Sequence, residues 1–248
     1  MNAKLLPTVT QVEGALPAHQ AILLAMATLA ELRESDTESH LLRVQHYVRA
    51  LAGALQGQPG YASVLTPDYV EMLCTCVPLY DLGTMGVPDR ILLKPGRLTA
   101  DEIAIMRTHT TQGFEALVRA ENTLGVSSPL LTMAKELTLS HQEKWDGSGY
   151  PQGLGGDRIP LSARMVALAD VFDALISNKV YKDGIAIDKA AQVIVSERGS
   201  HFDPVLVDAF VQVQAEFSAI AQQFVDTDED MQKKIEYMAN AIAEIAEL

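Results

Sequence analysis

Imidazole and carboxylate side chains occur in this sequence at positions where helical spacing predicts a buried, apolar face. His40 continues the stripe formed by Val44 and Val48, because residues about four apart lie on the same side of a helix. Asp36 precedes His40 by one turn on that face, and Asp81 ends a second apolar stripe. Burying such groups costs free energy unless they are paired or bind a metal ion. These positions are therefore the first candidates for chemistry.

The same pattern recurs farther along the chain. His109 and His141 each extend an apolar helical stripe, and Asp170 and Asp173 interrupt the apolar run 165–176. A single histidine on such a face is best explained as a satisfied core residue. Together, these histidines and acids are typical of a site for a divalent transition metal such as iron, manganese, nickel or zinc. A carboxylate shared by two such ions, with a hydroxide between them, would hydrolyse a phosphodiester.

The elements that must position these side chains are predicted to be helices. Apolar residues recur at helical spacing through most of the sequence, as in the stripe from Leu41 to Leu55, and no alternating strand pattern stands out. Three helix starts are indicated by local capping signals: Thr66 before Pro67, Thr99 with Glu102, and Asp203 before Pro204. We expect an all-α domain over residues 36–224, with an N-terminal linker or helix at 1–35 and a C-terminal helix at 225–248.

Composition and charge exclude several classes of function. With 248 residues, of which 48% are hydrophobic, the chain can bury a substantial core. A formal net charge of -13 opposes binding to a nucleic-acid polymer, so a small anionic ligand would need a local basic pocket. Cys74 and Cys76 are the two cysteines, and their spacing on a helix suggests neither a disulfide nor a shared metal. The sequence begins with neither a secretory signal nor a membrane span, so we expect a cytoplasmic protein.

The last residues of the chain carry a weak heptad pattern. Met231, Ile235, Met238, Ile242 and Ile245 follow alternating spacings of four and three after the acidic run 226–230. Such a helix could pair with a second chain to give a homodimer. The pattern is equally consistent with a helix that packs back onto its own domain.

One segment resembles the signature of a known family. The sequence HQEKWDGSGYP, from His141 to Pro151, is similar to the HHExWDGSGYP motif of HD-GYP proteins. Several other blocks resemble that family in the same order: LYDLGT at 79–84, GVPD at 86–89, ILLKPG at 91–96, ADVFDAL at 169–175 and HFDP at 201–204. The resemblance covers residues 36–224 and implies an HD-superfamily helical bundle.

The resemblance also implies an activity and a set of site residues. HD-GYP domains are metal-dependent phosphodiesterases that open cyclic di-GMP to linear pGpG, in some cases onward to GMP, in bacterial second-messenger signalling. Carried over by position, the metal ligands would be Asp36, His40, Asp81, His109, His141 and Asp170, holding two divalent ions, with iron or manganese favoured over nickel or zinc. Asp81 and Tyr150 would act in catalysis, and Tyr150, Lys179 and Lys182 would bind the substrate. Gly147 and Gly149 would allow positive-φ turns that aim Tyr150 inward.

Three positions depart from the family pattern. Tyr80 stands in place of the histidine of the HD pair, Thr84 in place of a lysine, and Gln142 in place of the second histidine of HHE. A phenol with a pKa near ~10 and a neutral amide are weaker metal ligands than imidazole. The first hypothesis is a weakened but active phosphodiesterase, and the second is a catalytically degenerate receptor for cyclic di-GMP. A third, hydrolysis of a related cyclic dinucleotide, needs no altered residue.

The family also bears on the partners of the chain. Its domains often follow a receiver or other sensor module, as in response regulators. We therefore expect such a module as a partner if this sequence is a fragment of a longer protein.

Overall fold

The computed structural model describes residues 25–30, 33, 39–125, 127–178 and 183–246, and in these ranges the chain forms helices and no strand. The predicted all-α class is confirmed. The α-helices are α2 Ser39–Gln56, α3 Pro67–Cys76, α4 Asp89–Leu92, α5 Ala100–Met106, α6 His109–Leu124, α7 Pro129–Ser140, α8 Leu161–Ile176, α9 Ile187–Ser196, α10 Pro204–Gln212, α11 Gln214–Gln223 and α12 Asp228–Ala246. Short 3₁₀ turns are η1 Val77–Leu79, η2 Leu82–Gly86 and η3 Gly156–Arg158.

The three helix starts predicted from capping signals are confirmed. The Thr66 side chain accepts a hydrogen bond from the Tyr69 backbone at the start of α3. Thr99 and Glu102 form a complete capping box on α5. At α10, the Asp203 carboxylate accepts from the Val205 backbone N–H. Each cap satisfies backbone donors that the helix itself leaves open.

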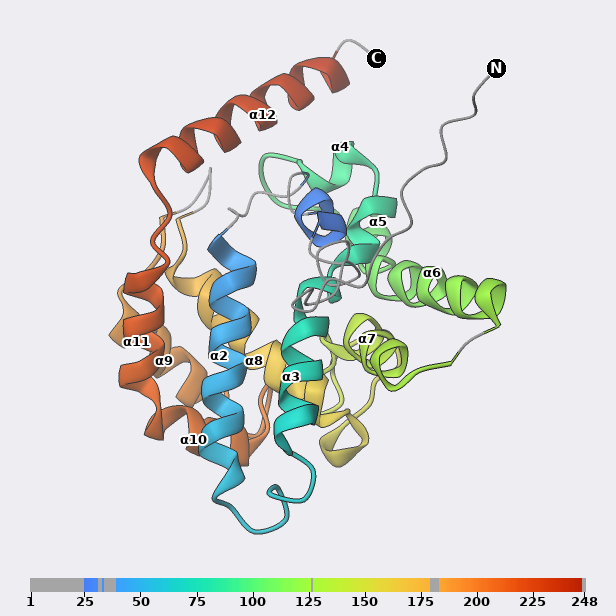
Figure 1. The fold of residues 1–248 in the computed structure, drawn as a ribbon. Helices are drawn as coiled ribbons and strands as arrows, with labels where there is room; N and C mark the ends of the chain where they lie inside the picture. Colours follow the sequence, from blue (N-terminus) through green and yellow to red (C-terminus); the bar gives the residue numbers. More distant parts are fainter. Residues whose placement is uncertain (1–24, 31–32, 34–38, 126, 179–182, 247–248) are drawn as a thin grey trace, which may run out of the picture.

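The core lies around α2 and α8, which run beside each other near the centre of the molecule (Figure 1). Four buried aromatic rings join this pair to α10 and α11. Phe172 of α8 lies 5.4 Å from Tyr47 of α2 and 5.1 Å from Phe217 of α11, measured between ring centroids. Phe210 of α10 completes the group at 5.4 Å from Phe172. These contacts fix α8, which carries Asp170 and Asp173, relative to α2, which carries His40.

A second contact region brings η2 against α6. A Cβ atom on Gly83 would lie 1.8 Å from the His109 carbonyl oxygen and 2.6 Å from the Gly113 backbone nitrogen. No side chain fits there, so glycine is required for the two backbones to meet. This approach places Asp81, the residue that precedes η2, beside the first residue of α6.

The C-terminal helix α12 crosses the end of the domain and packs against α4 (Figure 1). Met238 is buried, whereas Ile235 is 41% exposed. The helix therefore contacts its own chain through one of the heptad positions. Homodimerisation and the division into three segments stay predictions.

The two cysteines and the lengths of the helices bear on what the composition predicted. Cys74 and Cys76 are free and buried. Burial raises the pKa of Cys74 to about 11 and of Cys76 to about 12. Among the helices of the described residues, none has the length and apolar character needed to span a membrane.

Candidate metal centre

Asp81, His109 and His141 converge on one point in the described part of the chain. Asp81 Oδ1 lies 3.3 Å from His109 Nε2 and 3.1 Å from His141 Nε2. The two Nε2 atoms lie 3.3 Å apart. One ligand atom from each residue falls within 4.8 Å of the others, close enough for all three to bind a single ion. Both imidazoles are buried and Asp81 is partly exposed, so the site opens on one side.

The donor atoms have the right chemistry for a transition metal. His109 Nδ1 lies 2.7 Å from the Met106 carbonyl oxygen, and His141 Nδ1 lies 2.9 Å from that of Leu137. Because a carbonyl can only accept, each Nδ1 carries the hydrogen, and each Nε2 of a neutral ring offers a lone pair. Two lone pairs that face each other repel unless a proton or a metal ion lies between them. Two imidazoles and a carboxylate leave coordination positions open, as catalytic metal sites do.

The electrostatics of this group are dominated by Asp81. Burial alone would raise the pKa of Asp81, but the facing His141 and His109 outweigh burial and lower it. Burial would likewise lower the pKa of His141, yet Asp81 outweighs it and raises that pKa. For His109, burial prevails over Asp81 and lowers the pKa. Asp81 therefore stays ionised, the form that binds a cation.

His40 and Asp170 lie beside this group but do not join it. The Tyr80 hydroxyl stands between them, 2.7 Å from His40 Nε2 and 2.8 Å from Asp170 Oδ1. The Tyr80 ring also meets the His141 ring edge-on, with centroids 5.0 Å apart. Burial and the negative charge of Asp81 raise the pKa of Asp170.

Asp173 orients His40 and lies away from the converging donors. Its fully buried carboxylate is 2.8 Å from His40 Nδ1 and accepts hydrogen bonds from Arg43 Nε at 2.6 Å and from Ser177 Oγ at 3.0 Å. Burial would raise the pKa of Asp173, but His40 and Arg43 outweigh it and lower the pKa to about 2. His40 Nδ1 therefore donates to Asp173, and Nε2 faces Tyr80.

The loop after α7 is held by its own acidic residue. The buried Glu143 carboxylate accepts from the backbone N–H of Gln152 at 2.7 Å and of Leu154 at 3.0 Å. Gly147 has φ +83°, as predicted. The prediction for Gly149 is wrong, since its φ is not positive. Glycine is required at 149 because a Cβ there would lie 2.3 Å from the Lys144 backbone nitrogen.

This loop places Tyr150 at the edge of the candidate centre. The Tyr150 ring lies edge-on to the His109 ring, with centroids 6.2 Å apart. Burial, with Asp81 nearby, raises the pKa of Tyr150 to about 12, so its hydroxyl stays protonated and can donate at neutral pH. Arg107 lies over the same ring, with its guanidinium carbon 4.8 Å from the centroid.

Arg107 is a candidate that the sequence did not single out. It is exposed and ends α5, two residues before His109. An exposed arginine gives no periodic signal in the sequence, so its contact with Tyr150 is what points to a role. It supplies positive charge beside the site in a strongly acidic protein.

Several predicted residues lie elsewhere or outside the described residues. Asp36, Lys179 and Lys182 fall outside the residues that the structure describes. Thr84 is buried and donates its hydroxyl to the Asp81 carbonyl oxygen at 2.8 Å. The backbone carbonyl of Gln142 accepts from the Tyr150 backbone N–H at 3.2 Å, which joins the start of the loop to Tyr150.

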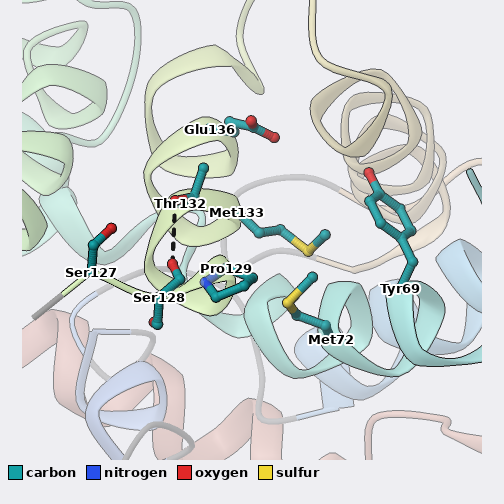
Figure 2. Close-up of a pocket in the computed structure, with 8 residues that line it drawn as sticks. All are labelled: Tyr69, Met72, Ser127, Ser128, Pro129, Thr132, Met133 and Glu136. Atoms are coloured by element: carbon teal, nitrogen blue, oxygen red, sulfur yellow. Dashed lines mark hydrogen bonds between the residues drawn. The ribbon is translucent and has the colours of Figure 1, made fainter.

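A surface pocket between α3 and α7 is separate from the converging donors (Figure 2). Met72 and Met133 point toward one another across it, and Glu136 lies at its far end (Figure 2). Burial raises the pKa of Glu136. Its lining contains no histidine, so we do not assign the predicted chemistry to it: Tyr69, Met72, Ser127, Ser128, Pro129, Thr132, Met133 and Glu136.

Comparison with known proteins identifies the family of this chain. A family model described as HD domain matches residues 64–206. A probable cyclic di-GMP phosphodiesterase of Vibrio cholerae is 49% identical over 211 residues, which are 85% of this chain and 48% of that protein. A cyclic di-GMP phosphodiesterase of the same organism is 50% identical, covering 82% of this chain and 41% of that protein. The chain thus spans less than half the length of these curated relatives.

A solved structure shows the same fold at low sequence identity. A cyclic GMP-AMP specific phosphodiesterase of V. cholerae aligns with a TM-score of 0.52 and 18% identity, over 90% of this chain and 59% of that one. A helical bundle with converging histidine and aspartate side chains, matched by the family model over most of the domain, defines an HD-type protein. The chain belongs to the HD domain family. Within it, the HD-GYP resemblance of the sequence is confirmed.

Proposed function

We propose that this chain is a metal-dependent phosphodiesterase that hydrolyses cyclic di-GMP to linear pGpG. The observation that carries the proposal is the convergence of Asp81 with two imidazole Nε2 atoms, 3.1 to 3.3 Å from its carboxylate oxygen. The names of the V. cholerae relatives support cyclic di-GMP as the substrate. The expected cytoplasmic location is part of this proposal.

The residues divide into two roles under this proposal. Asp81, His109 and His141 would hold a divalent transition metal, with iron or manganese favoured. The ion would supply Lewis-acid stabilisation of the charge that develops on the phosphodiester. Iron or manganese suits two imidazoles and a carboxylate better than magnesium, which prefers oxygen ligands.

Tyr150 and Arg107 would bind and orient the substrate. Tyr150 retains its proton, so its hydroxyl can donate to a phosphate or guanine acceptor. Arg107, stacked on that ring, can donate two parallel hydrogen bonds to a phosphate. The resemblance adds Lys179 and Lys182 to this group.

A receptor that binds cyclic di-GMP without cleaving it is the second candidate function. The position of the Tyr80 hydroxyl between His40 and Asp170 favours it, because two predicted ligands are thereby engaged elsewhere. A chain that uses only part of the predicted ligand set could keep the nucleotide site and lose turnover.

The two candidates are separated by one set of measurements. The purified chain, loaded with iron or manganese, is incubated with cyclic di-GMP, and linear product is followed by chromatography while binding is measured by calorimetry. We expect binding and cleavage, and loss of cleavage in His141→Ala. Binding without cleavage under both metals would exclude the phosphodiesterase and support the receptor. Absence of binding would contradict both, and cyclic GMP-AMP tested in parallel addresses the third hypothesis.

A further inference from the structure

The Tyr80 hydroxyl lies between His40 and Asp170 and contacts both side chains. The Tyr80 side chain is 2% exposed, so its place is set by packing and not by solvent. His40 Nε2 and Asp170 Oδ1 are 3.6 Å apart, and the hydroxyl lies within 2.8 Å of each. The two side chains are thus joined through Tyr80.

The atoms that Tyr80 contacts are the ones that a second metal ion would need. His40 Nδ1 donates to Asp173 at 2.8 Å, so Nε2 is the ring nitrogen that would bind an ion. That nitrogen faces Tyr80 at 2.7 Å, a normal hydrogen-bond length. We call His40 Nε2 and Asp170 Oδ1, with the Tyr80 hydroxyl between them, the half-site.

A histidine in place of Tyr80 would put a metal-binding nitrogen where the hydroxyl now lies. A phenol keeps its proton near neutral pH, whereas a neutral imidazole offers a lone pair to an ion. An aromatic contact also holds Tyr80 in place, since its ring meets the His141 ring edge-on. Rotation of the hydroxyl out of the half-site would therefore also disturb a ligand of the first ion.

We propose that Tyr80 takes the place of a second metal ion, so that the chain holds a single ion at Asp81, His109 and His141. His40 and Asp170 then serve as hydrogen-bond partners of Tyr80 and not as metal ligands. This inference rests on the proposed function for the existence of the metal centre, and it replaces the sequence-based expectation of two ions.

The test is a count of ions that does not depend on activity. The chain is loaded with Mn²⁺, freed of loose metal by gel filtration, and analysed by elemental mass spectrometry and electron paramagnetic resonance. We expect one Mn²⁺ per chain with the spectrum of an isolated ion. Two ions per chain, or the spectrum of a coupled pair, would overturn the inference. Since the wild-type chain is measured, this result needs no variant to fold.

Matched variants locate the ion and test the role of Tyr80. His141→Ala should lose the ion, whereas His40→Ala and Asp36→Ala should keep it, with circular dichroism checking the fold of each. Tyr80→His should gain a second ion and a coupled spectrum. Loss of the ion in His40→Ala, or a single ion in folded Tyr80→His, would contradict the proposal. Cyclic di-GMP cleavage is scored separately, so a wrong substrate would leave the ion count intact.

Discussion

At the scale of single residues, each imidazole is set by the one contact that its second nitrogen makes. Backbone carbonyls hold Nδ1 of His109 and His141, so their Nε2 atoms point into the centre. A carboxylate holds Nδ1 of His40, and its Nε2 meets a hydroxyl instead. Three histidines from one predicted ligand set therefore have two different chemical environments.

Arg107 provides the first prediction at this scale. Arg107→Ala should raise KM for cyclic di-GMP by roughly tenfold and leave kcat nearly unchanged, because a contact to a phosphate oxygen that does not change charge in the reaction binds substrate and transition state alike. Steady-state kinetics measure both constants. Arg107→Lys is the control, since it keeps the charge and loses the guanidinium group that lies over the Tyr150 ring. A fall in kcat with constant KM would contradict the assignment.

The residues that depart from the family pattern provide the second prediction. Tyr80→His combined with Gln142→His should speed cleavage about tenfold or more, because about 1.4 kcal/mol of added transition-state stabilisation is enough for that factor. Initial rates under manganese or iron loading give the answer. Tyr80→Phe with Gln142→Asn serves as the control without new imidazoles. Equal rates in both double variants would show that the altered residues do not limit turnover.

At the scale of elements, glycines allow the close contacts that assemble the site. Gly83 lets η2 meet α6, which brings Asp81 to His109. Gly149 lets the loop after α7 fold back on itself, while Glu143 binds two of its backbone N–H groups. The position of Tyr150 is thus set by backbone contacts within its own loop.

Gly149→Ala tests this role of the loop. A methyl group 2.3 Å from the Lys144 nitrogen must displace backbone, so we expect a loss of roughly 1–3 kcal/mol in stability and weaker binding of cyclic di-GMP. Gly53→Ala is the matched control: Gly53 lies exposed inside α2 with nothing within 4 Å of the added atom. That change should stabilise the chain by about 0.5–1 kcal/mol. Urea denaturation measures both, and an unaffected Gly149→Ala would refute the packing argument.

At the scale of the whole molecule, the donor atoms come from separate parts of the chain. Asp81 precedes η2, His109 begins α6, and His141 follows α7. Only the folded state brings them within reach of one ion, so metal binding and folding are coupled.

This coupling predicts a thermal shift. At an ion concentration 100 times Kd, binding adds about 2.7 kcal/mol to the free energy of unfolding, which corresponds to roughly 5–10 °C in Tm for a chain of this size. Differential scanning fluorimetry with Mn²⁺ and with a chelator measures the shift. His141→Ala should abolish it, and His40→Ala should retain it. An identical Tm with and without metal would argue against the centre.

The fold class and several local features could be predicted from the sequence because they depend on neighbours in the chain. The 3.6-residue periodicity indicates helices wherever the apolar face is continuous. Capping at Thr99 depends on Glu102 three residues later, and the HQEKWDGSGYP segment forms its loop from adjacent residues. The convergence of Asp81, His109 and His141 was expected from their place at the ends of apolar stripes and from the family resemblance.

Only the tertiary structure decided which partner each buried polar group meets. Tyr80 lies between His40 and Asp170, residues 40 and 90 positions away in the sequence. Asp173, three residues from Asp170, faces Arg43 and His40 because α8 packs on α2. Helical spacing defines which side chains share a face. The rotation and approach of packed helices decide whether a carboxylate on that face meets a metal ligand, a phenol or an arginine.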